Sequence, residues 1–284
     1  MIQDIAPHRL NNQFIPGLLP SPGDYIILYQ RDALAVDRLA QEEGQLVFPT
    51  FAAFPEADPG DFTYLFSLDE RPFFLYLPPQ PADLSEGPLT FLPFSELRSR
   101  DLYPREMVFA AYTAKHLQDW YRDFSFCGRC GRGAMEHSRT ERAMVCPHCG
   151  YTAYPRLMPA VIVGVIHEGR LLITRYDRGF AHNALIAGFT EIGETMEETV
   201  AREVMEEAGL KVKNIRYYKS QPWGSANDIL MGFYCDVDGS SAITPDRREL
   251  KYAAWTLPED IELQPTDYSL TNEMMKRFKD GLPC

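Results

Sequence analysis

The sequence has 284 residues, a length that accommodates two ordinary domains and a small insert between them. Apolar residues make up 45% and charged residues 24%, which is typical of a globular protein and excludes a disordered or membrane-embedded chain. The formal charge of −12 disfavours long polyanions such as duplex DNA, because no concentrated run of Lys and Arg offsets it.

The distribution of apolar residues predicts neither a membrane-spanning helix nor a signal peptide. No apolar run reaches the ~18 residues that a membrane-spanning helix needs. The start, MIQDIAPHRLNNQ, lacks the basic and apolar regions of a signal peptide. We therefore expect a cytoplasmic protein with no membrane partner.

Residues 1–124 are expected to form a small mixed β/α domain. Short apolar runs are broken by Pro, Gly and Asp, and two of them, DFTYLFSL and RPFFLYL, flank Asp69 and Glu70 and predict a hairpin. The earlier runs DYIILYQ and QLVFPTF also resemble strands. From Pro104 a helix is predicted, whose apolar face consists of Met107, Ala111, Ala114, Leu117 and Tyr121. Because no catalytic motif is present, we expect this domain to act as a scaffold or dimer contact.

Residues 125–154 predict a zinc-binding ribbon. Two CxxC pairs separated by 15 residues supply four thiols: Cys127, Cys130, Cys146 and Cys149. Tetrahedral zinc takes four such ligands at about 2.3 Å, so one structural Zn²⁺ per chain is expected. Thioredoxin-like redox chemistry is the alternative for a single CxxC, and the second pair argues against it. His137 and His148 lie nearby as alternative ligands.

The predicted zinc site is closed, because four thiolates leave no coordination position for water. We therefore expect zinc to stabilise a segment too small to bury its own core. The alternative role is nucleic-acid contact through the ribbon's basic residues, which are Arg129, Arg132, Arg139 and Arg142. Neighbouring Glu136 and Glu141 dilute this positive charge. Of the other cysteines, Cys235 is expected to be a buried small apolar residue, and Cys284 receives no role.

Residues 155–284 alternate between strand-like and helix-like segments and form the third predicted domain. The run from Ala160 to Asp177 predicts a hairpin, followed by a loop with several glycines and then a helix. Two further strands, VKNIRYYKSQ and DILMGFYCDV, follow the helix. A final helix is expected from about Ser269 to Lys279.

The helix of this third domain carries a cluster of glutamates. Thr195 and Glu198 form a capping box at its start, and Gly209 supplies a left-handed stop. Three glutamates at positions i, i+3 and i+4 then share one face and can converge on hard cations: Glu203, Glu206 and Glu207. Val200 and Val204 are expected to pack inward.

Such a glutamate cluster is more often a solvated helix face, and this alternative has to be weighed. Like charges this close destabilise a helix unless metal or arginine compensates them. Arg202 lies four residues from both Glu198 and Glu206, so we expect it to hold their carboxylates in fixed rotamers. The complete pattern therefore favours a metal site.

The segment GFTEIGETMEETVAREVMEEAGL resembles the Nudix box, G-x5-E-x7-R-E-U-x-E-E-x-G-U with U aliphatic, and every position matches. The resemblance implies an α/β/α sandwich that hydrolyses a nucleoside diphosphate linked to another group. It implies that the ligands of catalytic Mg²⁺ or Mn²⁺ are Glu203, Glu206 and Glu207, with one of them helping to activate water. Gly188 is the matching loop glycine, Arg202 the matching arginine and Glu194 a supporting carboxylate. Glu249 matches a later glutamate that serves relatives as a metal ligand or catalytic base.

The order of N-terminal domain, four-cysteine ribbon and Nudix domain is similar to the NADH pyrophosphatase group. That resemblance implies cleavage of NAD(H) to nicotinamide mononucleotide and AMP, removal of NAD caps from RNA, and a homodimer. The group carries SQPWPFPxS after the Nudix box. Here Ser220, Gln221, Pro222 and Trp223 match, but GSAND at 224–228 replaces PFPxS. The change removes an aromatic surface, and Gly224 is expected to loosen the loop.

The resemblance predicts a substrate pocket formed by Tyr154, Gln221, Pro222 and Trp223. Ordinary core packing is the alternative for both Tyr154 and Trp223. Three functions are held against each other: an NAD(H) diphosphatase, a hydrolase of another nucleoside diphosphate derivative such as ADP-ribose or a nucleotide sugar, and a ribbon-based RNA-binding module.

Overall fold

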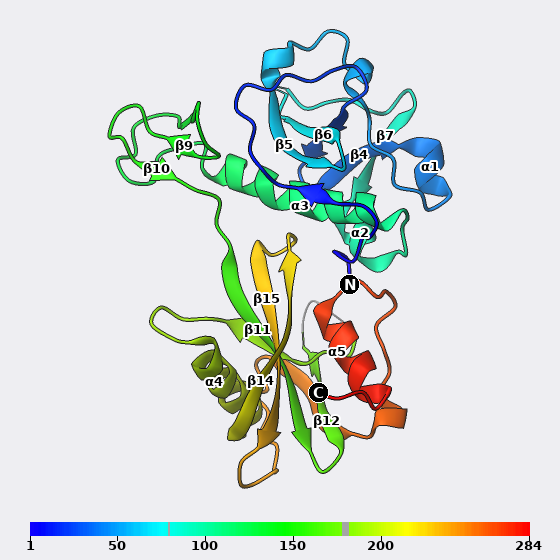
Figure 1. The fold of residues 1–284 in the computed structure, drawn as a ribbon, viewed down its shortest axis with the longest axis vertical. Coiled ribbons are helices and arrows are strands. Elements are labelled where there is room, and N and C mark those ends of the chain that lie inside the picture. Colours follow the sequence, from blue (N-terminus) through cyan, green and yellow to red (C-terminus); the bar gives the residue numbers. More distant parts are fainter. Residues whose placement is uncertain (79, 178–181) are drawn as a thin grey trace. The chain divides into compact units, whose positions relative to one another are not determined.

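The computed structural model describes residues 1–78, 80–177 and 182–284, which divide into two compact units (Figure 1). The N-terminal unit comprises Ile2–Arg156 together with the short segment Gly224–Asn227. The C-terminal unit comprises Met1, Leu157–Trp223 and Asp228–Cys284. Within the described residues, no helix combines the length and the apolarity that a bilayer crossing requires.

Before its cysteine-rich segment, the N-terminal unit contains two small sheets and the long helix α3. One sheet has the order β1-β5-β6-β2, formed by Leu10–Asn11, Phe62–Leu68, Arg71–Tyr76 and Tyr25–Ile27. The other has the order β3-β4-β7, formed by Tyr29–Gln30, Ala33–Asp37 and Leu89–Pro93. The helices are α1 (Arg38–Glu42), α2 (Phe94–Ser99) and α3 (Arg105–Asp123), with 3-10 turns at Phe51–Ala53 and Pro59–Asp61.

The hairpin and the helix predicted in this unit are confirmed. Strands β5 and β6 pair antiparallel around Asp69, which takes a left-handed φ of 54°. The predicted apolar face of α3 is buried from Ala111 to Tyr121. The run DYIILYQ, however, is not one strand, because β2 pairs with β6 while β3 pairs with β4 in the other sheet. The break at Leu28 lets one apolar run serve two sheets.

The N-terminal segment is tied to this hairpin through His8. Nδ1 of His8 lies 2.9 Å from Oδ2 of Asp69, and Nε2 lies 3.6 Å from Oε1 of Glu106 on α3. The hydrogen bond to Asp69 and the two negative charges raise the pKa of His8 above 6.5, against the opposing effect of burial. The stabilisation is therefore present below pH 6.5, and it is lost as the pH rises through the folded-state pKa.

We expect Asp69→Asn to lower the pKa of His8, because the variant removes a charge and weakens the hydrogen bond. The measurement is an NMR titration of the His8 ring protons in the full chain. Glu70→Gln on the same turn is the matched control, since Glu70 is exposed and should leave the titration unchanged. An unaltered His8 pKa in Asp69→Asn would contradict the assigned contact.

The cysteine-rich segment forms a three-stranded sheet in the order β10-β9-β8. Its strands are Glu136–His137 (β8), Met144–Val145 (β9) and Thr152–Ala153 (β10). The ring of His137 stacks on Tyr121 of α3, with centroids 4.9 Å apart and planes inclined by 20°. The ribbon therefore packs against the end of the helix that precedes it.

The C-terminal unit is built on a six-stranded mixed sheet. Its order is β14-β15-β11-β12-β16, with β13 also paired to β11. The strands are Met158–His167 (β11), Arg170–Tyr176 (β12), Ile186–Phe189 (β13), Val212–Trp223 (β14), Asp228–Val237 (β15) and Leu250–Thr256 (β16). Strands β11 and β15 are parallel and the other pairs are antiparallel. The predicted hairpin and the two strands after the helix are confirmed.

Helices cover both faces of this sheet, so the predicted α/β/α sandwich is confirmed (Figure 1). Helix α4 (Met196–Ala208) packs Val200 and Val204 onto one face, where Phe233 of β15 points. The next residue, Tyr234, points to the opposite face and donates a hydrogen bond of 2.8 Å to the carbonyl oxygen of Met274 in α5 (Leu270–Lys279). A 3-10 turn at Pro258–Asp260 precedes α5.

Candidate active site

The start and end of helix α4 follow from its sequence. The Oγ1 atom of Thr195 accepts a hydrogen bond from the backbone N–H of Glu198 at 3.2 Å, and Oε2 of Glu198 accepts one from the N–H of Thr195 at 2.8 Å. Gly209 closes the helix with φ of 70°. Since Val200 and Val204 are fully buried, the helix has a fixed rotation, and the glutamates that follow are presented toward β13.

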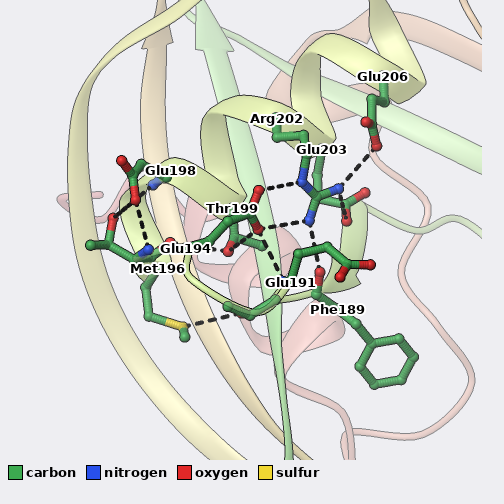
Figure 2. Close-up of polar contacts among 11 residues, drawn as sticks. Phe189, Glu191, Glu194, Met196, Glu198, Thr199, Arg202, Glu203 and Glu206 are labelled. Atoms are coloured by element: carbon green, nitrogen blue, oxygen red, sulfur yellow. Dashed lines mark hydrogen bonds and ion pairs between the residues drawn. The ribbon is translucent and has the colours of Figure 1, made fainter.

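Arg202 is the centre of the polar network on α4 (Figure 2). Its Nε donates to Oε1 of Glu194 at 2.6 Å, and Nη1 donates to Oε1 of Glu203 at 2.8 Å and Oε2 of Glu206 at 2.9 Å. Nη2 donates to the carbonyl oxygen of Phe189 at 2.8 Å. The planar guanidinium thus fixes three carboxylates and the carbonyl at the end of β13 at once.

The prediction that Arg202 pairs with Glu198, four residues before it, is wrong. The sequence spacing suggested Glu198, but that carboxylate is engaged in the capping box with Thr195. Glu194 from the preceding loop takes its place, and the Arg202 hydrogen bonds lower the pKa of Glu194 to about 2. A helical i, i+4 spacing could not reveal this contact, because it depends on the path of the loop.

Glu207 is the most buried of the three clustered glutamates, with 2% of its surface exposed. Its Oε1 accepts a hydrogen bond from the N–H of Ala187 at 3.3 Å, whereas its buried Oε2 has no hydrogen-bond partner. Burial raises the pKa of Glu207 to about 8, aided by the negative charges of Glu203 and Glu249. An orphaned, buried carboxylate oxygen among other carboxylates fits a hard cation such as Mg²⁺ or Mn²⁺.

Glu203 is 9% exposed and lies against Gly188 of β13. A Cβ atom added to Gly188 would overlap the carboxyl group of Glu203, so only glycine leaves this carboxylate its place. Burial raises the pKa of Glu203, and Arg202 opposes that shift. Gly188 and Glu203, which are 15 positions apart in the sequence, are thus direct neighbours in space.

Glu206 differs from its two neighbours because it is exposed. Its side chain is 59% accessible and is turned toward Arg202. Among the described residues, only the four cysteines form a group of three or more ligand-type side chains with donor atoms all within 4.8 Å. Arg202 bridges Glu203 and Glu206, whereas the carboxylate of Glu207 accepts a hydrogen bond from the backbone of Ala187, so a role for all three as cation ligands stays a prediction.

The segment before β16 brings Glu249 toward this cluster. The backbone N–H of Asp246 donates to the carbonyl oxygen of Glu207 at 3.0 Å, and the N–H of Asp177 donates to that of Glu249 at 2.9 Å. The charge of Glu249 contributes to the raised pKa of both Glu203 and Glu207, so it lies within electrostatic range of them. This placement supports the predicted role of Glu249 near the cations.

Two aromatic residues beside the cluster were missed from the sequence. Phe189 is 50% exposed; its backbone carbonyl oxygen accepts a hydrogen bond from Arg202, whereas its ring points away from the Arg202 network (Figure 2). A large aromatic residue directly after Gly188 was the signal that could have found it. Tyr176, at the end of β12, has a raised pKa because it is buried and because Glu207 and other carboxylates lie near it. No local pattern marks this tyrosine.

The predicted substrate-contacting residues are spread over different environments. Gln221 is fully buried, and its side-chain amide donates to the carbonyl oxygen of Tyr268 at 2.7 Å and accepts from the N–H of Leu270 at 2.6 Å. This placement favours a structural role, holding the start of α5, over the predicted substrate contact. Tyr154 is 55% exposed and donates a hydrogen bond to Glu141 at 3.1 Å.

Pro222 is exposed and Trp223 is 8% exposed at the end of β14. The expectation that Gly224 loosens the following loop is wrong. Gly224 is buried, and an added Cβ atom would overlap the carbonyl oxygen of Tyr112 in α3. Glycine is required here for close packing, so the segment Gly224–Asn227 is fixed on the helix of the N-terminal unit.

The four cysteines come together as predicted, with their sulfur atoms all within 4.8 Å of one another. The Sγ atoms of Cys127 and Cys149 are 3.8 Å apart, and those of Cys130 and Cys146 are 3.7 Å apart. Four sulfurs placed tetrahedrally at about 2.3 Å from one zinc ion lie about 3.8 Å from one another. Each CxxC turn is closed by a left-handed glycine, Gly131 or Gly150. The donor set fits zinc and needs neither histidine.

Comparison with known proteins agrees with both sites. Residues 156–278 match the family model described as NUDIX domain, and residues 122–154 match the one described as NADH pyrophosphatase zinc ribbon domain. Proteins named NAD-capped RNA hydrolase NudC, from Salmonella heidelberg and from an Enterobacter species, are 41% identical over 162 residues. The match spans 56% of this chain and 62% of each relative's length.

Among solved structures, a Nudix hydrolase from Nitrosomonas europaea superposes with a TM-score of 0.50 at 21% identity. The superposition covers 56% of this chain and 95% of that one, which establishes the fold. The two family matches together cover the four-cysteine site and the glutamate cluster of α4, and the ribbon directly precedes the sandwich. The chain therefore contains a Nudix domain at residues 156–278, directly preceded by a zinc ribbon domain of the NADH pyrophosphatase type at residues 122–154.

Proposed function

We propose that this chain hydrolyses the diphosphate bond of NAD(H), giving nicotinamide mononucleotide and AMP, and that the same site removes NAD caps from RNA. The observation that carries the proposal is the Arg202-centred carboxylate network with the orphaned oxygen of Glu207 at its buried end. The names of the similar proteins, NAD-capped RNA hydrolases, support this substrate.

In this proposal Arg202 orients the carboxylates of the cluster, and the carboxylates bind the cation. Arg202 holds Glu203 and Glu206 in fixed rotamers, so little conformational entropy is lost when they bind a ligand. Bound Mg²⁺ or Mn²⁺ would neutralise the diphosphate and lower the pKa of the attacking water. In this proposal Glu249, exposed beside the cluster, would accept a proton from the attacking water. The half-exposed ring of Phe189 offers a stacking surface for a base or nicotinamide.

The test is to incubate the purified chain with NADH and either Mg²⁺ or Mn²⁺ and to measure AMP by chromatography. We expect AMP and nicotinamide mononucleotide in equal amounts, and none after chelation of the divalent cation, because carboxylates without a cation cannot neutralise the diphosphate. No AMP under either metal would exclude the proposal.

A second candidate is hydrolysis of another nucleoside diphosphate derivative, such as ADP-ribose or a nucleotide sugar. The segment Gly224–Asn227 favours it, because GSAN supplies no aromatic surface and is packed on α3. A panel of nucleotides compared by kcat/KM separates the two candidates. NADH ranking above all other substrates would exclude the second.

RNA binding by the ribbon is the third candidate, and the geometry weakens it. One of its four arginines, Arg142, is directed into the N-terminal sheet rather than outward. Binding through the remaining three should weaken steeply with salt, since phosphate contacts release counterions. Binding that is absent or insensitive to salt would remove this candidate.

We further propose a cytoplasmic homodimer with domains at 1–124, 125–154 and 155–284. All six cysteines are free, which suits the reducing compartment that a zinc-thiolate site needs. The dimer rests on the resemblance to NADH pyrophosphatases. Sedimentation equilibrium of the full chain gives the mass that decides between one and two copies.

A further inference from the structure

Arg142 lies in the ribbon between β8 and β9, but its side chain reaches into the sheet of the N-terminal unit. Its Nη2 donates to the carbonyl oxygen of Leu65 in β5 and to that of Asn12, the latter at 3.3 Å. The guanidinium carbon lies 5.6 Å from the centre of the Phe14 ring. The side chain of Arg142 thus contacts both strand β5 and the N-terminal segment at residues 12–14.

The carbonyl of Leu65 is available because β5 is irregular at this point. Tyr64 pairs with Phe74 and Phe66 pairs with Phe73, so Leu65 is the extra residue of a β-bulge. The side chain of Leu65 is completely buried, and a buried carbonyl without a partner is costly. Arg142 supplies the hydrogen bond that the strand ladder does not.

Burying the charged side chain of Arg142 at this place costs free energy. Burial lowers its pKa, and carbonyl oxygens and aromatic rings surround the guanidinium rather than carboxylates. Its Nη1 atom is buried without a hydrogen-bond partner. A buried cation of this kind would return to water if its backbone were mobile, so the ribbon must fix the backbone.

The zinc ligands supply that rigidity. Cys146 follows Arg142 by four residues, and β9 between them pairs with both β8 and β10. Without the four-cysteine site this short sheet has too small a core to persist. We propose that the zinc ribbon is a latch on the N-terminal sheet, in which the zinc-held loop inserts Arg142 at the Leu65 bulge and so stabilises strand β5.

The test measures amide hydrogen exchange by mass spectrometry in the zinc-loaded full chain, with zinc content determined in parallel. We expect Arg142→Ala to retain zinc and to speed exchange in β5 and in residues 10–14 by about tenfold or more, the effect of losing a charge-assisted hydrogen bond. Chelating zinc from the wild type should speed exchange at the same amides. Strand β11 serves as the internal reference and should not change.

The matched control is Arg139→Ala, an exposed arginine of the same ribbon, which should leave β5 unchanged. Arg142→Lys provides a second variant if the alanine variant does not fold, and it should exchange at an intermediate rate because lysine lacks the fork of donors. The latch is overturned if amide exchange in β5 is unchanged in Arg142→Ala, or in Arg142→Lys where only that variant folds. It is also overturned if chelation speeds exchange only within residues 125–154.

Discussion

Turnover of NADH is expected to fall at least about 100-fold in Glu206→Gln, because loss even of outer partners of metal ligands costs 10- to 100-fold. The amide keeps the shape of the side chain and an oxygen for Arg202, but it removes the negative charge that a hard cation requires. Since Glu206 is 59% exposed, the fold should be unaffected. The measurement is kcat/KM with Mn²⁺, together with the melting temperature.

Glu197→Gln is the matched control for this variant. Glu197 is exposed on the same helix, nine residues before Glu206, which places it on the opposite side of α4. It should retain full activity. If Glu206→Gln also remained active, the acidic face of α4 would not be the cation site and the function proposed for it would fail.

Gly188→Ala is also expected to lower activity, but by a different route. The added methyl group overlaps the Glu203 carboxyl, which lies at the free end of a side chain and can rotate away. The fold should therefore survive, while the displaced carboxylate loses its contact with Arg202. We expect weaker Mn²⁺ binding by electron paramagnetic resonance, and turnover reduced by about 10- to 100-fold, as for other partners that orient metal ligands.

Gly23→Ala controls for the general effect of replacing glycine, because no atom lies within 4 Å of its added Cβ. That variant should bind Mn²⁺ and turn over NADH like the wild type. Unchanged Mn²⁺ affinity in Gly188→Ala would show that the position of Glu203 has no influence on cation binding.

The parts of the site that could be predicted from the sequence are those encoded over a few residues. The capping box of Thr195 and Glu198 and the two CxxC turns are local, because each contact is made within one turn of chain. The strand β15 was likewise evident from its apolar run.

The remaining features depend on contacts that no window of sequence contains. Glu194 replaces Glu198 as the partner of Arg202 because the loop after β13 folds back on the helix. Gly224 is buried because α3, more than 100 residues earlier, lies against it. The resemblance predicted that Gln221 contacts the substrate, whereas its amide satisfies the backbone at the start of α5. In each case tertiary packing decided the role.

The parallel pairing of β11 with β15 has a consequence for the order in which the chain folds. Met158 lies opposite Asp228, so the central pair of the sheet joins residues 70 positions apart. Contacts this distant form late, since the entropy of closing the loop must be lost first. During synthesis, α4 and its glutamates therefore emerge from the ribosome well before β15, and the central strand pair of their sheet forms only after β15 has been released.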